Sequence, residues 1–306
     1  MANNDKGQNL INKYVWLIDT ILRWGKISYK KLNNEWVGTD FSHGANLPKR
    51  TLNNWRDGIA DMFGIDIANE NCGEYCYYIE NPDVINGCGI KAWLYNTFSV
   101  GNTLLDCQNV RDRIVLENVP SGHFYLQTIV EAIKSNHVLK ITYQKYDDDG
   151  ERTFNVQPYC LKLFRQRWYL VANKISDMVK VYSLDRIKQI SITDKKFEMP
   201  DDWNASVYFD GCYGIIISGE NNNEIFPVKL KVSASQANYI RSLPLHESQN
   251  EDERNEEYSI FSYRLRETYD FEQEILRNGS GVEVLEPPIL RNKIKRIITE
   301  MAKKYK

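Results

Sequence analysis

The chain has 306 residues, of which 42% are hydrophobic and 26% are charged. At about 100–200 residues per domain, this length predicts two or three packed domains and excludes a single small module. Lys and Arg number 39 against 41 Asp and Glu, so the net charge is −2 and no field of one sign covers the molecule. A polyanionic partner would therefore have to meet a local basic patch.

The sequence shows no sign of a membrane or secreted protein. No run of residues approaches the roughly 18 apolar residues of a membrane span. Residues 1–8 are polar and lack the apolar core of a secretory signal. We therefore expect a cytoplasmic protein with no membrane partner. Its six cysteines are too few for a disulfide scaffold and are expected to be reduced thiols.

Charge alternates along the chain. Residues 1–58 and 119–200 each carry a net charge of +4, whereas residues 59–118 carry −6 and residues 201–306 carry −4. Two separated basic zones favour two separate anionic partners. Ordinary solvated surface is the alternative explanation.

The N-terminal residues predict three helices. Apolar residues at helical spacing predict a first helix that ends at Gly25. Ser28 can cap a second, short helix. Pro48 is expected to begin a third helix, which Gly64 ends.

A hairpin and a helical bridge follow. Residues 65–67 and 75–79 are β-rich runs on either side of a turn. Three helices and a hairpin predict a winged helix-turn-helix domain over residues 1–82. Residues 83–118 are expected to form a helical bridge, in which three apolar residues share one side: Trp93, Leu94 and Phe98.

The third helix has the composition of a DNA-reading helix. Its buried face is predicted to hold Leu52, Trp55, Ile59 and Met62. Arg can form two hydrogen bonds with guanine and Asn can do so with adenine, while Lys or Thr can hold phosphate. The candidate DNA-binding residues are Lys49, Arg50, Thr51, Asn53, Asn54 and Arg56. A plain amphipathic surface helix is the alternative.

Residues 119–200 predict a small β-barrel. A helix over residues 124–135 is followed by five short β-rich segments, and this density of strands is typical of a small barrel. The segments are residues 139–143, 153–163, 168–172, 180–184 and 189–193.

The C-terminal part predicts an α/β sandwich. Residues 201–225 are expected to be a linker. From residue 226 the order is strand, helix, hairpin, helix, strand and a last helix, which is the split βαβ arrangement of ferredoxin-like folds. The acidic run at residues 251–257 is expected to be the exposed tip of the hairpin.

Known catalytic and metal-binding patterns are missing from the sequence. Cys72 and Cys76 have no second close pair or nearby His, which argues against zinc. Residues 147–150 lack the alternating ligands of a calcium loop and are expected to form a hairpin turn. The sequence has neither a phosphate-binding Gly-Lys-Ser/Thr loop nor a Gly-x-Gly-x-x-Gly turn. We therefore expect no cofactor, no metal and no enzymatic activity.

One predicted barrel strand combines cations with aromatic rings. On a strand of period two, Arg167 and Tyr169 share one face, and Trp168 and Leu170 share the other. A groove of Arg and aromatic side chains suits a nucleotide or single-stranded nucleic acid, because the cation meets phosphate and the ring stacks on a base. The alternative is that Arg pairs with Asp185 while Tyr fills the core.

At these residues the chain resembles the WYL-domain transcriptional regulators of bacteria. The resemblance rests on the triplet Trp168, Tyr169 and Leu170, on Arg152, and on residues 139–143, 157–159 and 182–187. Residues 245–249 and 281–287 look like the C-terminal extension that accompanies this domain.

The resemblance implies an α+β multidomain protein. Its parts would be an N-terminal winged helix-turn-helix, a central Sm-like (SH3-like) β-barrel as sensor over residues 119–200, and a C-terminal ferredoxin-like α/β sandwich over residues 226–306. Such proteins act as homodimers on palindromic operators, and their barrel is thought to sense nucleic-acid or nucleotide signals. Several members govern DNA-damage or phage-defence genes.

The sequence thus predicts a ligand-responsive, DNA-binding transcriptional regulator. Its partners would be operator DNA, a second copy of the chain, and a nucleotide or single-stranded nucleic-acid effector, with coupling through residues 90–117. The rival hypotheses are a nuclease or nucleotide hydrolase that uses the barrel pocket, and an adaptor that binds another protein. The candidate effector-binding residues are Tyr143, Arg152, Arg165, Arg167, Trp168, Tyr169, Tyr182, Ser183 and Arg186.

Overall fold

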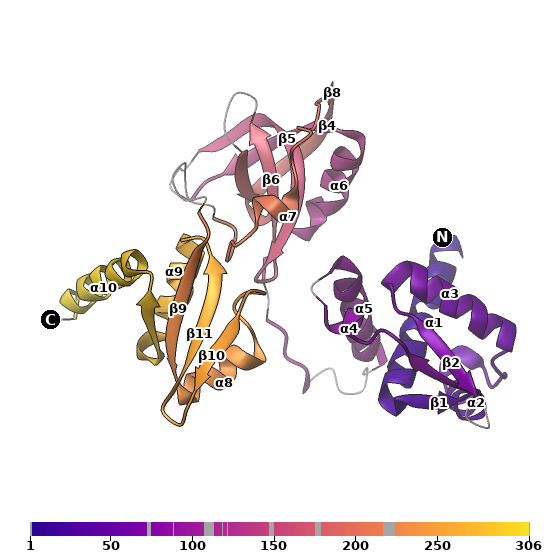
Figure 1. Cartoon of the computed structure of the whole chain (residues 1–306). Helices are drawn as coiled ribbons and strands as arrows, with labels where there is room; N and C mark the ends of the chain where they lie inside the picture. The colour runs from indigo at the N-terminus through magenta and orange to yellow at the C-terminus, as the bar shows by residue number, and fades with distance from the viewer. Residues whose placement is uncertain are drawn as a thin grey trace. The chain divides into compact units, whose positions relative to one another are not determined.

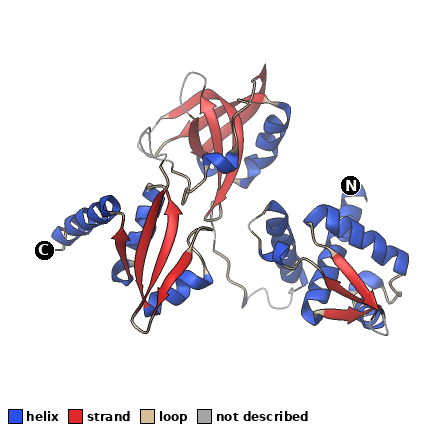
Figure 2. Ribbon diagram, viewed as in Figure 1, coloured by secondary structure: helices blue, strands red, loops and turns tan. Residues whose placement is uncertain are grey.

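The computed structural model shows a mixed α/β protein, and its described residues form three sheets (Figure 2). The chain divides into two compact units, Met1–Glu117 and Asn118–Lys306 (Figure 1). None of the described helices is long and apolar enough to cross a membrane. The structure describes residues 2–71, 75–87, 89–106, 113–117, 119–120, 122–146, 150–174, 179–216 and 224–305.

In the first unit, helices surround a three-stranded antiparallel sheet of order β1-β3-β2. Its elements are α1 (Ala2–Trp24), β1 (Lys26–Ser28), α2 (Tyr29–Val37), η1 (Asp40–Ser42), α3 (Lys49–Phe63), β2 (Ile67–Asn71), β3 (Tyr75–Ile79), α4 (Asp83–Asn86) and α5 (Ile90–Asp106). The helix ends predicted at Gly25, Ser28, Pro48 and Gly64 are confirmed. Ser28 caps α2 by accepting a hydrogen bond from the Lys31 amide, and Gly64 ends α3 in the left-handed conformation.

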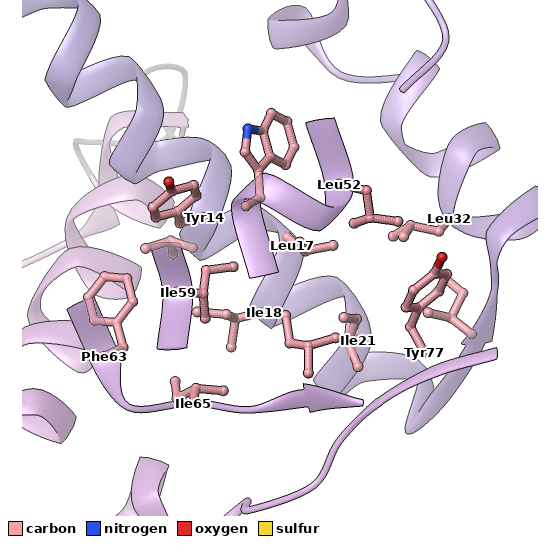
Figure 3. Packing of buried hydrophobic residues seen from close by; sticks show 14 of the residues in the cluster. Tyr14, Leu17, Ile18, Ile21, Leu32, Leu52, Ile59, Phe63, Ile65 and Tyr77 are labelled. Atoms are coloured by element: carbon pink, nitrogen blue, oxygen red, sulfur yellow. The ribbon is translucent and has the colours of Figure 1, made fainter. Parts of the chain in front are cut away.

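The core of this unit lies between α1, α3 and the sheet, where apolar side chains from all three meet (Figure 3). Phe63 of α3 is fully buried, whereas Met62 is 37% exposed. The prediction that Met62 belongs to the buried face is therefore wrong. Phe63 takes that place because its ring meets two aromatic rings of α5, those of Tyr95 and Phe98, at 6.0 and 6.4 Å.

Helix α5 is part of this core. Tyr95 and Ser99 donate hydrogen bonds to the carboxylate of Asp19 in α1. Leu94 and Phe98 pack against the core, but Trp93 is 42% exposed and so does not share their side. The predicted bridge helix is therefore part of the first unit. Its helical backbone extends to Asp106, and residues 107–112 lie outside the described residues.

The second unit contains two sheets. Its elements are η3 (His123–Tyr125), α6 (Leu126–Ser135), β4 (His137–Gln144), β5 (Glu151–Phe164), β6 (Arg167–Lys174), β7 (Val179–Ser183), η4 (Leu184–Arg186), β8 (Ile187–Lys196), α7 (Ala205–Tyr208), β9 (Phe226–Ser233), α8 (Ala234–Ser242), β10 (Asn250–Arg254), β11 (Tyr258–Leu265), α9 (Tyr269–Arg277), η5 (Gly279–Gly281), β12 (Val282–Glu286) and α10 (Pro288–Lys303).

The five-stranded sheet is antiparallel throughout, with the order β7-β6-β5-β4-β8. No described strand pairing joins its edges β7 and β8, so the predicted barrel is not closed. The sheet is nevertheless curled. In a flat sheet these edges would lie roughly 19 Å apart. The four residue steps across η4, which connects the two strands, span at most about 14 Å.

The four-stranded sheet has the order β10-β11-β9-β12, and every pairing in it is antiparallel. The chain order of strand, helix, two strands, helix and strand is the predicted one. The core of this part holds side chains from the central strands and from α9, among them Leu230, Phe261, Tyr263 and Phe271.

The acidic run at residues 251–257 is only partly a hairpin tip. Glu251 belongs to β10, and its two carboxylate oxygens accept hydrogen bonds from Nε and Nη2 of Arg241 in α8, at 2.8 and 2.6 Å. These bonds lower the pKa of Glu251 to about 2. The prediction that the whole run is exposed is therefore wrong at Glu251, because its partner comes from a neighbouring helix.

This ion pair predicts a pH dependence of stability. A carboxyl whose pKa falls from 4.5 to about 2 on folding stabilises the fold above pH 4.5, and this stabilisation is lost as the pH falls toward 2. We expect Glu251→Gln to lower the urea midpoint at pH 6 and to flatten its fall between pH 5 and pH 2.5. Circular dichroism of the full chain in urea measures both. Parallel pH curves for the variant and the wild type would contradict the prediction.

Candidate functional sites

A cavity of about 540 Å³ opens beside the η4 turn of the second unit. Five tyrosine rings form much of its wall: Tyr143, Tyr146, Tyr169, Tyr182 and Tyr208. Three cations also line it: Lys145, Lys180 and Arg186. No Asp or Glu of the described residues is among its lining residues. The site is thus both aromatic and positively charged.

Arg186 is held in place by neutral groups. Its guanidinium carbon lies 4.0 Å from the centre of the Tyr146 ring and 4.9 Å from that of Tyr143. Its Nε donates a hydrogen bond to the carbonyl oxygen of Gln144 at 3.0 Å. Within the described part of the chain, no carboxylate lies within ion-pair distance of this side chain. These contacts orient its charge, and no described side chain neutralises it by an ion pair.

Asp185, the neighbour of Arg186, bonds elsewhere. Its carboxylate accepts a short hydrogen bond from the hydroxyl of Ser183. The amide of Ser183 in turn donates to the hydroxyl of Tyr143 at 3.2 Å. The alternative considered from the sequence is therefore observed only in part: Asp185 does not pair with Arg186, but Tyr143 and Tyr182 are buried in the core of the sheet.

Two of the lining tyrosines, Tyr143 and Tyr169, are uncharged near neutral pH. Burial raises the pKa of Tyr143, and Arg186 lowers it by a smaller amount. Burial likewise raises the pKa of Tyr169. Both phenols therefore stay protonated, and the charge of the cavity comes from its cations.

The cavity brings together five of the nine predicted effector residues: Tyr143, Tyr169, Tyr182, Ser183 and Arg186. Trp168 does not line the cavity and packs against the sheet core, in which Tyr143 and Tyr182 are themselves buried. Arg152 pairs with Tyr143 across strands, but neither it nor Arg167 is among the lining residues.

Arg165 has a different role from the predicted one. It lies in the tight turn between β5 and β6, pairs with the carboxylate of Glu274 in α9, and donates to the hydroxyl of Tyr213 at 3.2 Å. Since Glu274 is buried, this arginine connects the five-stranded sheet to the C-terminal part of the chain. We therefore do not place it in the cavity.

Several cavity residues were missed from the sequence. Lys145 and Tyr146 follow the strand predicted to end at residue 143, and Lys180 lies within the strand predicted over residues 180–184 but was not taken for an effector-binding residue. Tyr208, Ile215 and Ile216 lie in the predicted linker. The one available signal was that this linker is richer in aromatic and branched residues than a flexible connection usually is.

On α3, four of the six predicted DNA-binding side chains are exposed: Lys49, Arg50, Asn53 and Asn54. Thr51 is half-buried. Arg56 is tied to the sheet, since its Nε donates to the Ile67 carbonyl at 2.8 Å and its guanidinium lies over the Tyr77 ring. The face that is open to a partner is thus formed by the first turns of the helix.

Other sequence expectations concern metals and thiols. No group of three His, Cys, Asp or Glu among the described residues could hold a metal ion. Cys76, Cys160 and Cys212 are free thiols. Cys72, Cys88, Cys107 and the acidic turn at residues 147–149 lie outside the described residues.

Comparison with family models matches a WYL domain to residues 125–192 and a WCX domain to residues 224–302. The chain contains a WYL domain followed by a WCX domain. The resemblance derived from Trp168, Tyr169 and Leu170 is confirmed. The WYL match includes α6 and the five-stranded sheet up to Ile192, and the WCX match includes the four-stranded sheet.

Two solved structures are similar at low identity. Proteasome accessory factor B/C (PafBC) of Arthrobacter aurescens is 18% identical, with a TM-score of 0.33 over 94% of this chain and 45% of that chain. The chain thus spans less than half of that protein. A CRISPR Cas-related protein is 12% identical, with a TM-score of 0.39 over 90% of this chain and 77% of that chain. The comparison with curated proteins finds no match.

Proposed function

We propose that the protein is a transcriptional regulator whose WYL domain binds a phosphate-bearing effector, a nucleotide or a single-stranded nucleic acid. The observation that carries this proposal is Arg186, a cation held by two tyrosine rings and a carbonyl inside a cavity with no described carboxylate in its lining. Phosphate can complete the hydrogen bonding of the guanidinium, and the rings can stack on a base. We interpret the curled sheet as an Sm-like sensor.

The proposal assigns operator binding to the first unit. We interpret α1, α2, α3 and the sheet β1-β3-β2 as a winged helix-turn-helix with α3 as its recognition helix. Residues 1–58 carry a net charge of +4, and the exposed side chains of α3 include one Arg, one Lys and two Asn. This inventory suits contacts with base edges and phosphates.

Coupling between the two functions would pass through the point where the chain enters the WYL domain. Gly122 has a φ of +65°, and a Cβ there would overlap the backbone of Leu184 and Asp185 in η4. The same turn carries Arg186. An effector that moves η4 would therefore move the chain that continues from the first unit.

The proposal includes no catalysis and no cofactor. A nuclease or nucleotide hydrolase would consume its ligand in the presence of magnesium, whereas a sensor returns it intact. An adaptor would show DNA binding that is absent or insensitive to salt. Recovery of intact effector and a steep salt dependence of DNA affinity would separate the regulator from both rivals.

Substitutions in α3 test the DNA-binding role. We expect Arg50→Ala and Asn54→Ala each to weaken specific operator binding by about 1–3 kcal/mol, because each side chain can pair with a base edge. Lys49→Ala should weaken binding to all sequences alike and reduce the salt slope. Gel-shift titration at several salt concentrations, on a site found by footprinting upstream DNA, measures these effects. Unchanged operator affinity in both Arg50→Ala and Asn54→Ala would show that α3 does not read bases in the DNA groove.

Substitution of Arg186 tests the effector site. A charge-assisted contact is worth about 1.5–3 kcal/mol, so Arg186→Ala should lose roughly tenfold or more in affinity for the best ligand of a panel of cyclic nucleotides and 5′-phosphorylated oligonucleotides. Arg167→Ala is the matched control, because Arg167 lies outside the lining and should cost less. Calorimetry with and without operator DNA should give two different dissociation constants, since coupling is reciprocal. Equal constants would show that the cavity is not the switch.

We also expect a homodimer. One recognition helix neutralises too few phosphates for useful affinity, and two half-sites about one helical turn apart supply the rest. Light scattering should therefore give twice the chain mass of 35.8 kDa, together with a repeated footprint. A monomer at micromolar concentration with a single, unrepeated footprint would contradict this.

A further inference from the structure

One wall of the cavity comes from outside the matched WYL domain. Tyr208, Ile215 and Ile216 line the cavity, yet they follow the end of the WYL match at residue 192 and precede the WCX match at residue 224. We call residues 208–216 the strap. The strap supplies an aromatic ring and two branched apolar side chains to a site whose cations all belong to the WYL domain.

The WCX domain holds the strap by its backbone. Oδ2 of Asp270, in the first turn of α9, accepts hydrogen bonds from the amides of Ile215 and Ile216 at 2.8 and 3.0 Å. Just before that helix, the hydroxyl of Thr268 donates to the carbonyl of Tyr213 at 2.8 Å. The two apolar residues that line the cavity are thus positioned by one carboxylate of the other domain.

Gly214 makes this close approach possible. It has a φ of +91°, and a Cβ at this position would overlap the side chain of Asp270. Any larger residue would have to push the carboxylate away from the amides it binds. The glycine at position 214 of the strap therefore allows Asp270 to bind the two amides.

The WYL sheet also contacts the strap, at Tyr213. The ring of Tyr213 packs between Phe164 of β5 and Phe271 of α9, at 5.8 and 5.9 Å between ring centres. Arg165 bonds to the hydroxyl of Tyr213 and to Glu274. Tyr213 therefore contacts both the WYL and the WCX domain. Movement of the whole strap out of the cavity would break these contacts between the two domains.

We propose that Asp270 of the WCX domain is a positioning residue for the effector: it holds the strap as the apolar wall against which the base of a nucleotide ligand packs. Effector binding and docking of the WCX domain onto the WYL domain are then coupled. This inference rests on the proposed function for the identity of the ligand. The phosphate is bound by the WYL cations, and the base is selected by a wall that the WCX domain controls.

The affinity for the effector should depend on the fraction of molecules in which the strap is in place. If the cavity binds a base only while the strap is in place, the apparent dissociation constant rises in inverse proportion to the fraction of molecules with the strap in place. Loss of the two Asp270 bonds should lower that fraction. A ligand without bases would use only the cations and should be insensitive to the strap.

The experiment compares two ligands in the full chain. One is a 5′-phosphorylated single-stranded pentanucleotide, and the other is an abasic pentanucleotide with the same phosphates. We expect Asp270→Ala to weaken binding of the base-bearing probe about tenfold and to change binding of the abasic probe by less than about twofold. Asp270→Asn keeps an oxygen acceptor and should restore most of the affinity. Equal losses for both probes, or no loss for either, would overturn the proposal.

A glycine pair provides a second, matched test. Gly214→Ala should act like Asp270→Ala, because the added Cβ displaces the carboxylate. Gly279→Ala places a Cβ at a similarly positive φ of +57° with no atom within 4 Å, so it controls for backbone strain alone. Wild-type selectivity for the base-bearing probe in Gly214→Ala would overturn the proposal.

A third measurement needs no ligand. Cys212 lies in the strap and is 5% exposed, so its rate of alkylation by iodoacetamide, located by mass spectrometry, reports opening of the strap. We expect this rate to rise at least fivefold in Asp270→Ala and Gly214→Ala but not in Gly279→Ala. If the wild type binds neither probe, the effector assignment fails, and alkylation alone decides the role of Asp270. Unchanged alkylation in both variants would then overturn it.

Discussion

The short connection across η4 is the constraint on which the rest of the second unit depends. Three residues join strands at opposite edges of a five-stranded sheet, so the sheet must curl until those edges come near each other. Curling produces a concave surface beside the turn, and the turn itself places Ser183 and Arg186 on that surface. The same turn also receives Gly122, the entry point of the chain from the first unit. The η4 turn thus contacts both the cavity and Gly122, the residue at which the chain enters the WYL domain.

Two arginines in neighbouring turns show how local partners separate structural from ligand-binding cations. Arg165 meets a buried carboxylate, Glu274, and its charge is used to join two domains. Arg186 meets two tyrosine rings and a carbonyl, which orient it without cancelling its charge. Among the described residues no carboxylate pairs with Arg186, so its charge is available to an anion that enters the cavity. The electrostatics therefore favour Arg186, and not Arg165, as the ligand contact.

Most helices and strands could be predicted from local sequence patterns. The errors arose at residues whose environment depends on contacts with distant parts of the chain. Ser28, Pro48 and Gly64 mark helix ends by their own backbone chemistry, so the limits of α2 and α3 were correct. Met62 was wrongly placed in the core in preference to Phe63, and Glu251 was taken as exposed, because the partners of Phe63 and Glu251, α5 and Arg241, lie elsewhere in the chain. The strap was taken for a linker for the same reason, since Asp270 lies more than fifty residues away.

The strength of the Asp270 contact fits a sensor better than a rigid scaffold. Hydrogen bonds to a charged group contribute about 1.5–3 kcal/mol each. A ligand at a hundred times its dissociation constant stabilises the state that binds it by about 2.7 kcal/mol. Tyr213, packed between Phe164 and Phe271, anchors the middle of the strap to both domains. The Asp270 bonds position only the segment beyond it, Ile215 and Ile216, and their energy is comparable with that of ligand binding. An effector at ordinary concentrations can therefore decide whether these two residues are in place. Holding two amides with one carboxylate, made possible by Gly214, places this wall of the cavity in the range where binding and domain docking control each other.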